Sequence, residues 1–173
     1  FLAAGVIGRK KITLTGLKED SVQGDKKILQ VLRDLGADIE ITENGITAHP
    51  SVLHGITVDA ADIPDLVPVL SVVAANAKGQ TEIINCGRLR FKESDRIEAV
   101  YNMIKNLGGK ITVENDDIII EGSPLTGGEI DSVNDHRIAM SGAVAAFSAS
   151  GAVTIKGAEA VKKSYPSFWD EIR

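Results

Sequence analysis

The residue types best suited to chemistry are concentrated in two short charged segments. The run 88–96 (Arg-Leu-Arg-Phe-Lys-Glu-Ser-Asp-Arg) places cations and carboxylates between a predicted strand and the first turn of a predicted helix. The run 134–137 (Asn-Asp-His-Arg) occupies a similar corner further along the chain. Unpaired N–H groups at a helix N-terminus already favour anions, so additional cations there predict a site for a negatively charged ligand. The plainer interpretation is a solvated turn in which Ser94 or Asp95 caps the helix.

Charged residues from four such corners are candidates for one shared site. Taken singly, Asp65 in a first helical turn would be explained by the helix dipole, and Lys163 by solvation. If the strand-to-helix turns gather at one edge of the domain, Arg96, Arg137 and Lys163 would converge on an anion. Asp65 and Glu93 would then lie nearby as candidate proton carriers. Cations packed around carboxylates are costly unless a ligand or a mechanism uses them, so a small molecule with phosphate and carboxylate groups fits this site best.

A repeat of about 72 residues organises the elements that must position these corners. Amphipathic helices are predicted at about 25–35 and 95–107, and each ends in Leu-Gly, where Gly36 and Gly108 are expected to be left-handed. Alternating strands follow both helices as hairpins, with predicted turns at Asn44-Gly45 and Asn115-Asp116. Second helices are predicted at 62–77 and 135–149. The unit therefore reads strand, helix, strand, strand, strand, helix.

The copies of this unit suggest how the chain is divided. We place them at about 9–80 and 81–152, with a partial third copy at 153–173. Residues 1–7 match the end of a second helix, and the third copy stops after one helix. We therefore expect residues 1–173 to be most of one domain of a longer protein. A repeat of this length is a domain-building module and is too long for a solenoid unit.

Composition excludes several classes of function. The chain has 173 residues, of which 43% are hydrophobic and 25% charged, as in ordinary soluble globular proteins. Its net charge of −5 argues against a nucleic-acid or anionic-membrane partner recognised by bulk charge. No apolar run approaches the roughly 20 residues that span a bilayer. The single cysteine, Cys86, cannot form an internal disulfide, which favours a reducing, cytoplasmic location, and we expect it in the core.

The charged segments together resemble the C-terminal portion of the 5-enolpyruvylshikimate-3-phosphate (EPSP) synthase family. The resemblance rests on 92–96 (Lys-Glu-Ser-Asp-Arg), 134–137 (Asn-Asp-His-Arg) and 163–166 (Lys-Ser-Tyr-Pro), while 21–25 (Ser-Val-Gln-Gly-Asp) and 62–65 (Asp-Ile-Pro-Asp) fit the same family. It implies an α+β enolpyruvyl transferase-like domain of repeated βαβαββ modules with pseudo-threefold symmetry. It also implies a second domain and a short N-terminal segment that this chain lacks, with the active site between the two domains.

The implied reaction transfers the carboxyvinyl group of phosphoenolpyruvate to the 5-hydroxyl of shikimate 3-phosphate, a step in chorismate and aromatic amino acid biosynthesis. It proceeds by addition and elimination through a tetrahedral intermediate. By motif matching, Asp65 is the base toward the hydroxyl, Glu93 the proton donor, and Lys92 a contact to both substrate and Asp65. The resemblance implies neither a cofactor nor a metal.

The remaining implied contacts hold the anionic groups. The cations that match the phosphoenolpyruvate clamp are Arg96, Arg137 and Lys163. Asp135 and His136 match residues that support these contacts or touch the leaving phosphate. Some family members carry Asn at the place of Arg88, so we assign Arg88 no role. The implied partners are phosphoenolpyruvate and shikimate 3-phosphate, bound together with the missing domain, in a monomeric parent protein.

Two alternatives remain open at this point. The first is the related enzyme that transfers enolpyruvate to UDP-N-acetylglucosamine, which an assay with each acceptor would distinguish. The second is that residues 1–173 alone are a folded but inert module. Half of a binding site gains too little from its contacts to offset the cost of immobilising a small anion, so we expect the isolated chain to be inactive.

Overall fold

The structure, a computed structural model, describes residues 1–17 and 24–172. Its α-helices and strands are, in chain order, α1 Leu2–Ile7, β1 Ile12–Leu14, α2 Ile28–Asp34, β2 Ile39–Thr42, β3 Gly45–Ala48, β4 Thr57–Asp59, α3 Val67–Ala75, β5 Gln80–Ile84, α4 Arg96–Asn106, β6 Lys110–Glu114, β7 Asp117–Glu121, β8 Gly128–Asp131, α5 His136–Ala145, β9 Val153–Lys156 and α6 Phe168–Glu171. Short 3-10 helices are η1 Gly24–Lys27, η2 Pro64–Leu66, η3 Gly87–Phe91 and η4 Ala158–Lys163. The predicted order of strand, helix, strand, strand, strand, helix is observed from β1 to α3 and again from β5 to α5.

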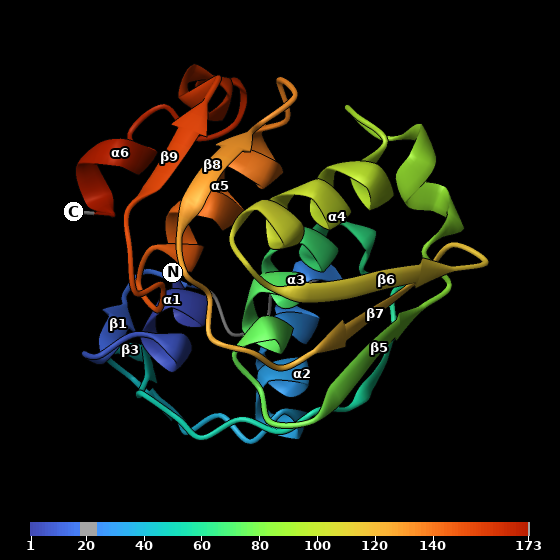
Figure 1. Cartoon of the computed structure of the whole chain (residues 1–173). Helices are drawn as coiled ribbons and strands as arrows, with labels where there is room; N and C mark the ends of the chain where they lie inside the picture. The colour runs from blue at the N-terminus through green and yellow to red at the C-terminus, as the bar shows by residue number, and fades with distance from the viewer. Residues whose placement is uncertain (18–23, 173) are drawn as a thin grey trace.

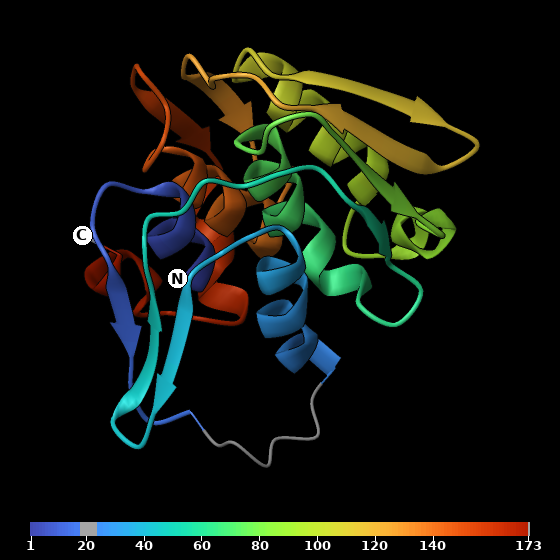
Figure 2. The ribbon, with the colours of Figure 1, turned by 90° about the horizontal axis from the view of Figure 1, so that it is seen from below.

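The strands of the described residues form three sheets whose pairing repeats. Their orders are β1-β3-β2, β4-β5-β7-β6 and β8-β9. The antiparallel set β1-β3-β2 matches β5-β7-β6, and the parallel pair β8-β9 matches β4-β5. The segment from β4 to β7 is therefore one continuous βαβαββ unit, which corresponds to the expected module. Figure 2 shows the three sheets on different sides of a central group of helices.

The helices α1, α3 and α5 form the centre of the molecule (Figure 1). Helix α3 packs against α1, α4 and α5, and α5 also packs against η4 and β9. All residues of α3 except Val69 are buried, as expected for a helix that is apolar on all sides and enclosed by other elements. Helix α4 instead buries one stripe, which includes Ile97, Val100 and Ile104, on the sheet side of the core.

Turn chemistry and helix ends agree with the sequence in most places. Gly36 and Gly108 have φ values of 96° and 84°, so the predicted left-handed helix ends are confirmed. Asn115 and Asp116 (φ 50° and 70°) form the predicted turn between β6 and β7, with both central residues left-handed.

Other predicted boundaries are wrong by a few residues. The turn before β3 lies at residues 43–44, because Gly45 already pairs with Thr42 in the ladder. The predicted helix 62–77 is divided into η2 and α3. The predicted helix 135–149 ends at Ala145, since the N–H groups of residues 146–148 bond to carbonyls three positions back. Among the described residues, no helix is long and apolar enough to cross a membrane.

Candidate active site

Two helix N-termini meet at the candidate site, and each is capped by an aspartate. The carboxylate of Asp95 accepts the backbone N–H groups of Ile97 (3.1 Å) and Glu98 (3.2 Å) at the start of α4. The carboxylate of Asp135 accepts the N–H of Arg137 (2.9 Å) at the start of α5. The plainer interpretation of Asp95 as a helix cap is therefore confirmed. Asp135 has a second role besides capping α5, because its side chain also faces α4.

The buried centre of the site is Arg96. Its side chain has no exposed surface, and each of its three guanidinium nitrogens donates to a carboxylate. Nε donates to Asp135 (2.7 Å), Nη1 to Asp65 (2.7 Å) and Nη2 to Glu93 (2.5 Å). Ser94 adds a hydroxyl donor to Asp135 at 3.0 Å. One guanidinium thus joins the segment before α4, the start of α5 and the η2 corner.

Two further cations contact Asp65 from the partly exposed side of this cluster. Lys92 Nζ lies 3.2 Å from one carboxylate oxygen of Asp65, and Arg137 Nη2 lies 3.2 Å from the other. Asp25 lies 3.7 Å from Arg137. We call the six residues Asp65, Lys92, Glu93, Arg96, Asp135 and Arg137 the charged network. It has a buried floor, formed by Arg96 and Asp135, and a rim that solvent reaches.

The network sets the ionisation of Asp135, Asp65 and Arg96. Burial raises the pKa of Asp135, but the hydrogen bond and charge of Arg96 outweigh this effect, so the pKa stays below its ordinary value. Partial burial also raises the pKa of Asp65, and the cations Arg137, Lys92 and Arg96 more than reverse it. Burial lowers the pKa of Arg96, whereas Asp135 and its other partners raise it further, so the net pKa lies above normal. All three groups are therefore charged at neutral pH.

His136 lies beside the network in its neutral form. Burial, followed by the charge of Arg137, lowers the pKa of the imidazole. Its Nδ1 is buried, lies 4.0 Å from Asp135, and has no hydrogen-bond partner within the described residues. A neutral imidazole of this kind can accept or donate one hydrogen bond without adding charge.

Lys163 reaches the same corner from η4. Its Nζ donates to the backbone carbonyl of Asn134 at 2.7 Å, next to Asp135. The corner itself has an unusual backbone, since Val133 and Asn134 both have positive φ values, 46° and 59°. The structure therefore brings Lys163 to the segment that carries Asp135, where it bonds to the backbone and not to the carboxylates of the charged network.

Arg90 connects the start of α4 to the β6–β7 turn. It forms ion pairs with Asp95 (2.8 Å) and with Asp116 (2.5 Å) at the β6–β7 turn. Arg88 is exposed, and Phe91 is 88% exposed next to Lys92. Cys86 is fully buried, which confirms it as a core residue, and it lies between β5 and η3. Burial, with the nearby charge of Asp117, raises the pKa of its thiol to about 12.

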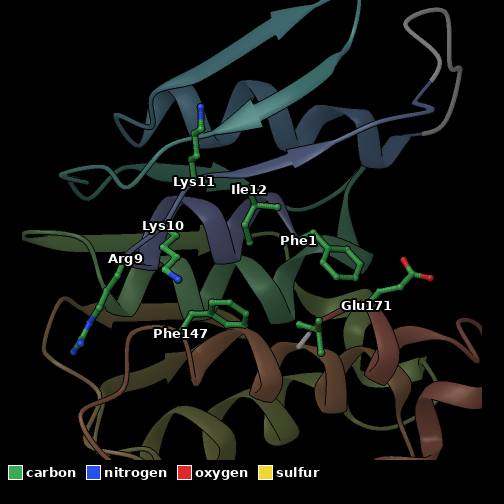
Figure 3. Close-up of a pocket in the computed structure, with 8 residues that line it drawn as sticks. Phe1, Arg9, Lys10, Lys11, Ile12, Phe147 and Glu171 are labelled. Atoms are coloured by element: carbon green, nitrogen blue, oxygen red, sulfur yellow. The ribbon is translucent and has the colours of Figure 1, made fainter.

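A separate cavity of about 440 Å³ lies at another part of the surface. The side chains of Phe1, Ile12 and Phe147 face one another around it, with Glu171 at one side and the basic run 9–11 close by (Figure 3). It shares no residue with the charged network. The charged network, with its buried floor and exposed rim, therefore lies outside this cavity.

Three contacts in and around the network were not anticipated from sequence. Asp25 pairs with Arg137, Ser94 donates to Asp135, and the Ser132 hydroxyl accepts the backbone N–H of Asn134. Asp25 and Ser94 belong to the segments 21–25 and 92–96 that support the resemblance, whereas no sequence pattern marked Ser132. Residues 21–23 lie outside the described part of the chain. In residues 1–17 and 24–172, no group of His, Cys and carboxylate side chains is arranged to hold a metal.

Comparison with solved structures defines the class of fold. A structure of EPSP synthase from Acinetobacter baumannii superposes with a TM-score of 0.85 at 32% identity, over 98% of this chain and 42% of that one. A second structure from the same organism gives a TM-score of 0.82 at 31% identity. The three sheets around central helices are thus an α+β enolpyruvyl transferase fold.

Comparison with sequences defines the family. The family model of EPSP synthase (3-phosphoshikimate 1-carboxyvinyltransferase) matches residues 1–172. The 3-phosphoshikimate 1-carboxyvinyltransferases of Clostridium kluyveri and Clostridium acetobutylicum are each 45% identical over 100% of this chain. That of Methanoregula boonei is 44% identical over 98%. The chain belongs to the EPSP synthase family. It spans about 40% of the length of these curated relatives, 41%, 40% and 40% respectively.

Proposed function

We propose that this chain forms one wall of the active site of a 3-phosphoshikimate 1-carboxyvinyltransferase. The reaction joins the enolpyruvyl carbon of phosphoenolpyruvate to the 5-hydroxyl oxygen of shikimate 3-phosphate and releases inorganic phosphate. It needs a proton delivered to the methylene carbon, a proton removed from the hydroxyl, and cations for two phosphates and a carboxylate. The family membership and the composition of the charged network both support this reaction.

The observation that carries the proposal is the position of Arg96 between Asp65 and Glu93. One buried guanidinium fixes both carboxylates, at 2.7 Å and 2.5 Å, while each keeps a partly exposed surface. Two carboxylates held at a set spacing, with different neighbours, are what addition and elimination with separate proton transfers require. We assign Asp65 as the base toward the hydroxyl and Glu93 as the proton donor.

The rim cations couple substrate binding to the basicity of Asp65. In the unliganded site Lys92 and Arg137 lie against Asp65 and lower its pKa, which makes it a weak base. Phosphate and carboxylate groups of the substrates would draw Lys92, Arg137 and Lys163 toward themselves. Asp65 would then lose part of its cationic surroundings, its pKa would rise, and it would become a stronger base when the substrate is present.

Arg96 acts in this proposal through the residues it positions. The resemblance assigns Arg96 to the phosphoenolpyruvate clamp. Its three guanidinium nitrogens already donate to Asp65, Glu93 and Asp135, so a direct contact between Arg96 and phosphoenolpyruvate would require one of these carboxylates to move. By the family resemblance, Asp135 and His136 would support the contacts to the leaving phosphate; the Nδ1 of His136 is buried and has no hydrogen-bond partner among the described residues.

The proposal is tested by kinetics of the full-length protein with both substrates. We expect Asp65→Asn and Glu93→Gln each to lower kcat by about 10² to 10⁴, the usual contribution of a positioned proton carrier. Phosphoenolpyruvate binding should survive better than turnover. Phosphate release and product formation measure the rate, and equilibrium titration measures binding.

Matched controls are available at the same corners. Asp62→Asn removes an exposed carboxylate three residues before Asp65, and Glu98→Gln removes an exposed one in the first turn of α4. Both should retain nearly full activity. Turnover with UDP-N-acetylglucosamine alone as acceptor would contradict the proposed substrate, and unchanged kcat in both site variants would contradict the proposed roles.

A further inference from the structure

Ser132 is a fully buried serine that joins the two elements at the Asp135 corner. Its hydroxyl donates to the carbonyl of Gly157 at 2.9 Å and accepts the backbone N–H of Asn134 at 3.2 Å. Gly157 precedes η4, whose last residue is Lys163. Asn134 precedes Asp135, the cap of α5. One buried hydroxyl therefore connects the segment that carries Asp135 to the helix that carries Lys163.

The backbone between Ser132 and Asp135 is strained and is held from several directions. Val133 and Asn134 have left-handed φ values of 46° and 59°, which are costly for side chains, above all for β-branched valine. Asp131 Oδ1 accepts the N–H of Val133 at 2.8 Å, and Lys163 donates to the carbonyl of Asn134 at 2.7 Å. Such a conformation persists only where its surroundings over-determine it.

Resting on the roles proposed above for Asp65 and Glu93, we infer that Ser132 is a positioning residue for the catalytic carboxylates. Its hydroxyl holds the strained turn 133–134, which sets the place of Asp135. Asp135 holds Nε of Arg96 at 2.7 Å, and Arg96 in turn holds Asp65 and Glu93. Ser132 touches none of these four side chains directly and acts through the backbone.

The hydroxyl of Ser132 lies close to Gly157 because residue 157 has no side chain. A Cβ atom at Gly157 would lie 2.5 Å from Ser132 Oγ, so the glycine lets the two segments approach. Without the hydroxyl, the Asn134 N–H and the Gly157 carbonyl would lose a buried partner. The turn would then relax toward ordinary φ values and shift Asp135.

The test observes the Arg96 Nε–H group by ¹⁵N–¹H NMR in the unliganded chain. This proton is buried and bonded to Asp135, so it should exchange slowly with solvent. We expect Ser132→Ala to shift its resonance and to speed its exchange by about tenfold, as for a lost buried hydrogen bond. Ser132→Thr keeps the hydroxyl and should restore the wild-type signal. Because the measurement needs no substrate, its failure is separate from failure of the proposed reaction.

Ser71→Ala is the matched control, since Ser71 is also fully buried and donates to a helix carbonyl, that of Val67, at 2.8 Å. It should lower stability without changing the Arg96 signal. If Ser132→Ala does not fold, Gly157→Ala displaces the same hydroxyl from the opposite side and should change the signal in the same way. An unchanged Arg96 signal in these variants, or a changed one in Ser132→Thr, would overturn the inference.

Discussion

Arg96 can hold three carboxylates because a planar guanidinium presents N–H groups in several fixed directions, which a lysine ammonium at the same place could not match. The arrangement also explains why a fully buried cation is tolerated. Asp135, equally buried, supplies the opposite charge at 2.7 Å, and Asp65 and Glu93 complete the hydrogen bonds. Removing one partner of such a buried charge leaves the other uncompensated, which strongly destabilises the fold.

Asp135→Asn tests this at the scale of one residue. The variant leaves Arg96 without its buried counter-charge, so we expect it to lose about 3 kcal/mol of stability at pH 7 in denaturant titrations. Because the folded pKa of Asp135 lies below its ordinary value of 3.8, this contribution is present at neutral pH and is lost as the pH falls through the folded pKa. The difference between variant and wild type should therefore shrink in acid.

The exposed Asp62 provides the control for that experiment. Its ion pair with Lys27 is largely solvated, with the Asp62 side chain 79% exposed, so Asp62→Asn should change stability by less than about 1 kcal/mol at either pH. A pH-independent loss in Asp135→Asn would show that shape, and not charge, accounts for the role of Asp135.

The sequence indicated which residues belong to the charged network, but it did not indicate how they are arranged. Charge type and the positions of the corners indicated Asp65, Glu93, Arg96 and Arg137, and the family resemblance added Lys92 and Asp135; the structure brings all six into the charged network. Lys163, which the corners also indicated, bonds to the backbone of Asn134 instead. Burial could not be inferred, because an arginine in a first helical turn is ordinarily exposed. Nor did any sequence pattern mark Ser132, since its role depends on the backbone of Gly157, which is distant in sequence.

At the scale of elements, the two Leu-Gly helix ends show how turn chemistry fixes a boundary. Gly108 has φ 84°, and a Cβ atom there would lie 2.4 Å from Thr126 Oγ1. Gly108→Ala should therefore cost about 2 kcal/mol or more, from backbone strain together with displacement of Thr126. Thermal or urea unfolding of the chain measures the loss.

Gly79 offers a matched comparison for Gly108. Its φ is 86°, nearly the same, but a Cβ atom added there would have no atom of the described residues within 4 Å beyond its immediate chain neighbours. Gly79→Ala should cost about 1 kcal/mol, from backbone strain alone. Equal losses in the two variants would mean that Thr126 adapts freely and that only the backbone conformation matters.

Local sequence patterns predicted the helices and strands, but they could not predict which strands pair when these are distant in sequence. The β6–β7 hairpin was predicted with its turn because Asn115 and Asp116 tolerate left-handed φ values. The parallel pairs β4-β5 and β8-β9 were not predicted, since they join strands separated by a helix and cross the boundaries drawn between repeat copies. Period and turn chemistry carry no information on which distant strand becomes a neighbour.

At the scale of the whole molecule, we expect residues 1–173 to be insufficient for the proposed reaction. The charged network has a solvent-exposed rim, and the chain covers about 40% of the length of its relatives, 41% and 40% in two of them. We expect residues 1–173 alone to release no measurable phosphate from phosphoenolpyruvate and shikimate 3-phosphate, whereas the full-length protein should do so. Steady-state release by the purified chain that Glu93→Ala abolishes would contradict this.

The buried thiol of Cys86 makes the opening of the site measurable. It is the one cysteine of the chain, it lies between β5 and η3 just before the segment 88–96, and its pKa of about 12 leaves almost no thiolate at neutral pH. An alkylating reagent should therefore react only in molecules whose corner has transiently opened. The rate of alkylation of Cys86 then measures how often the structure beside the charged network unfolds locally, without any introduced probe.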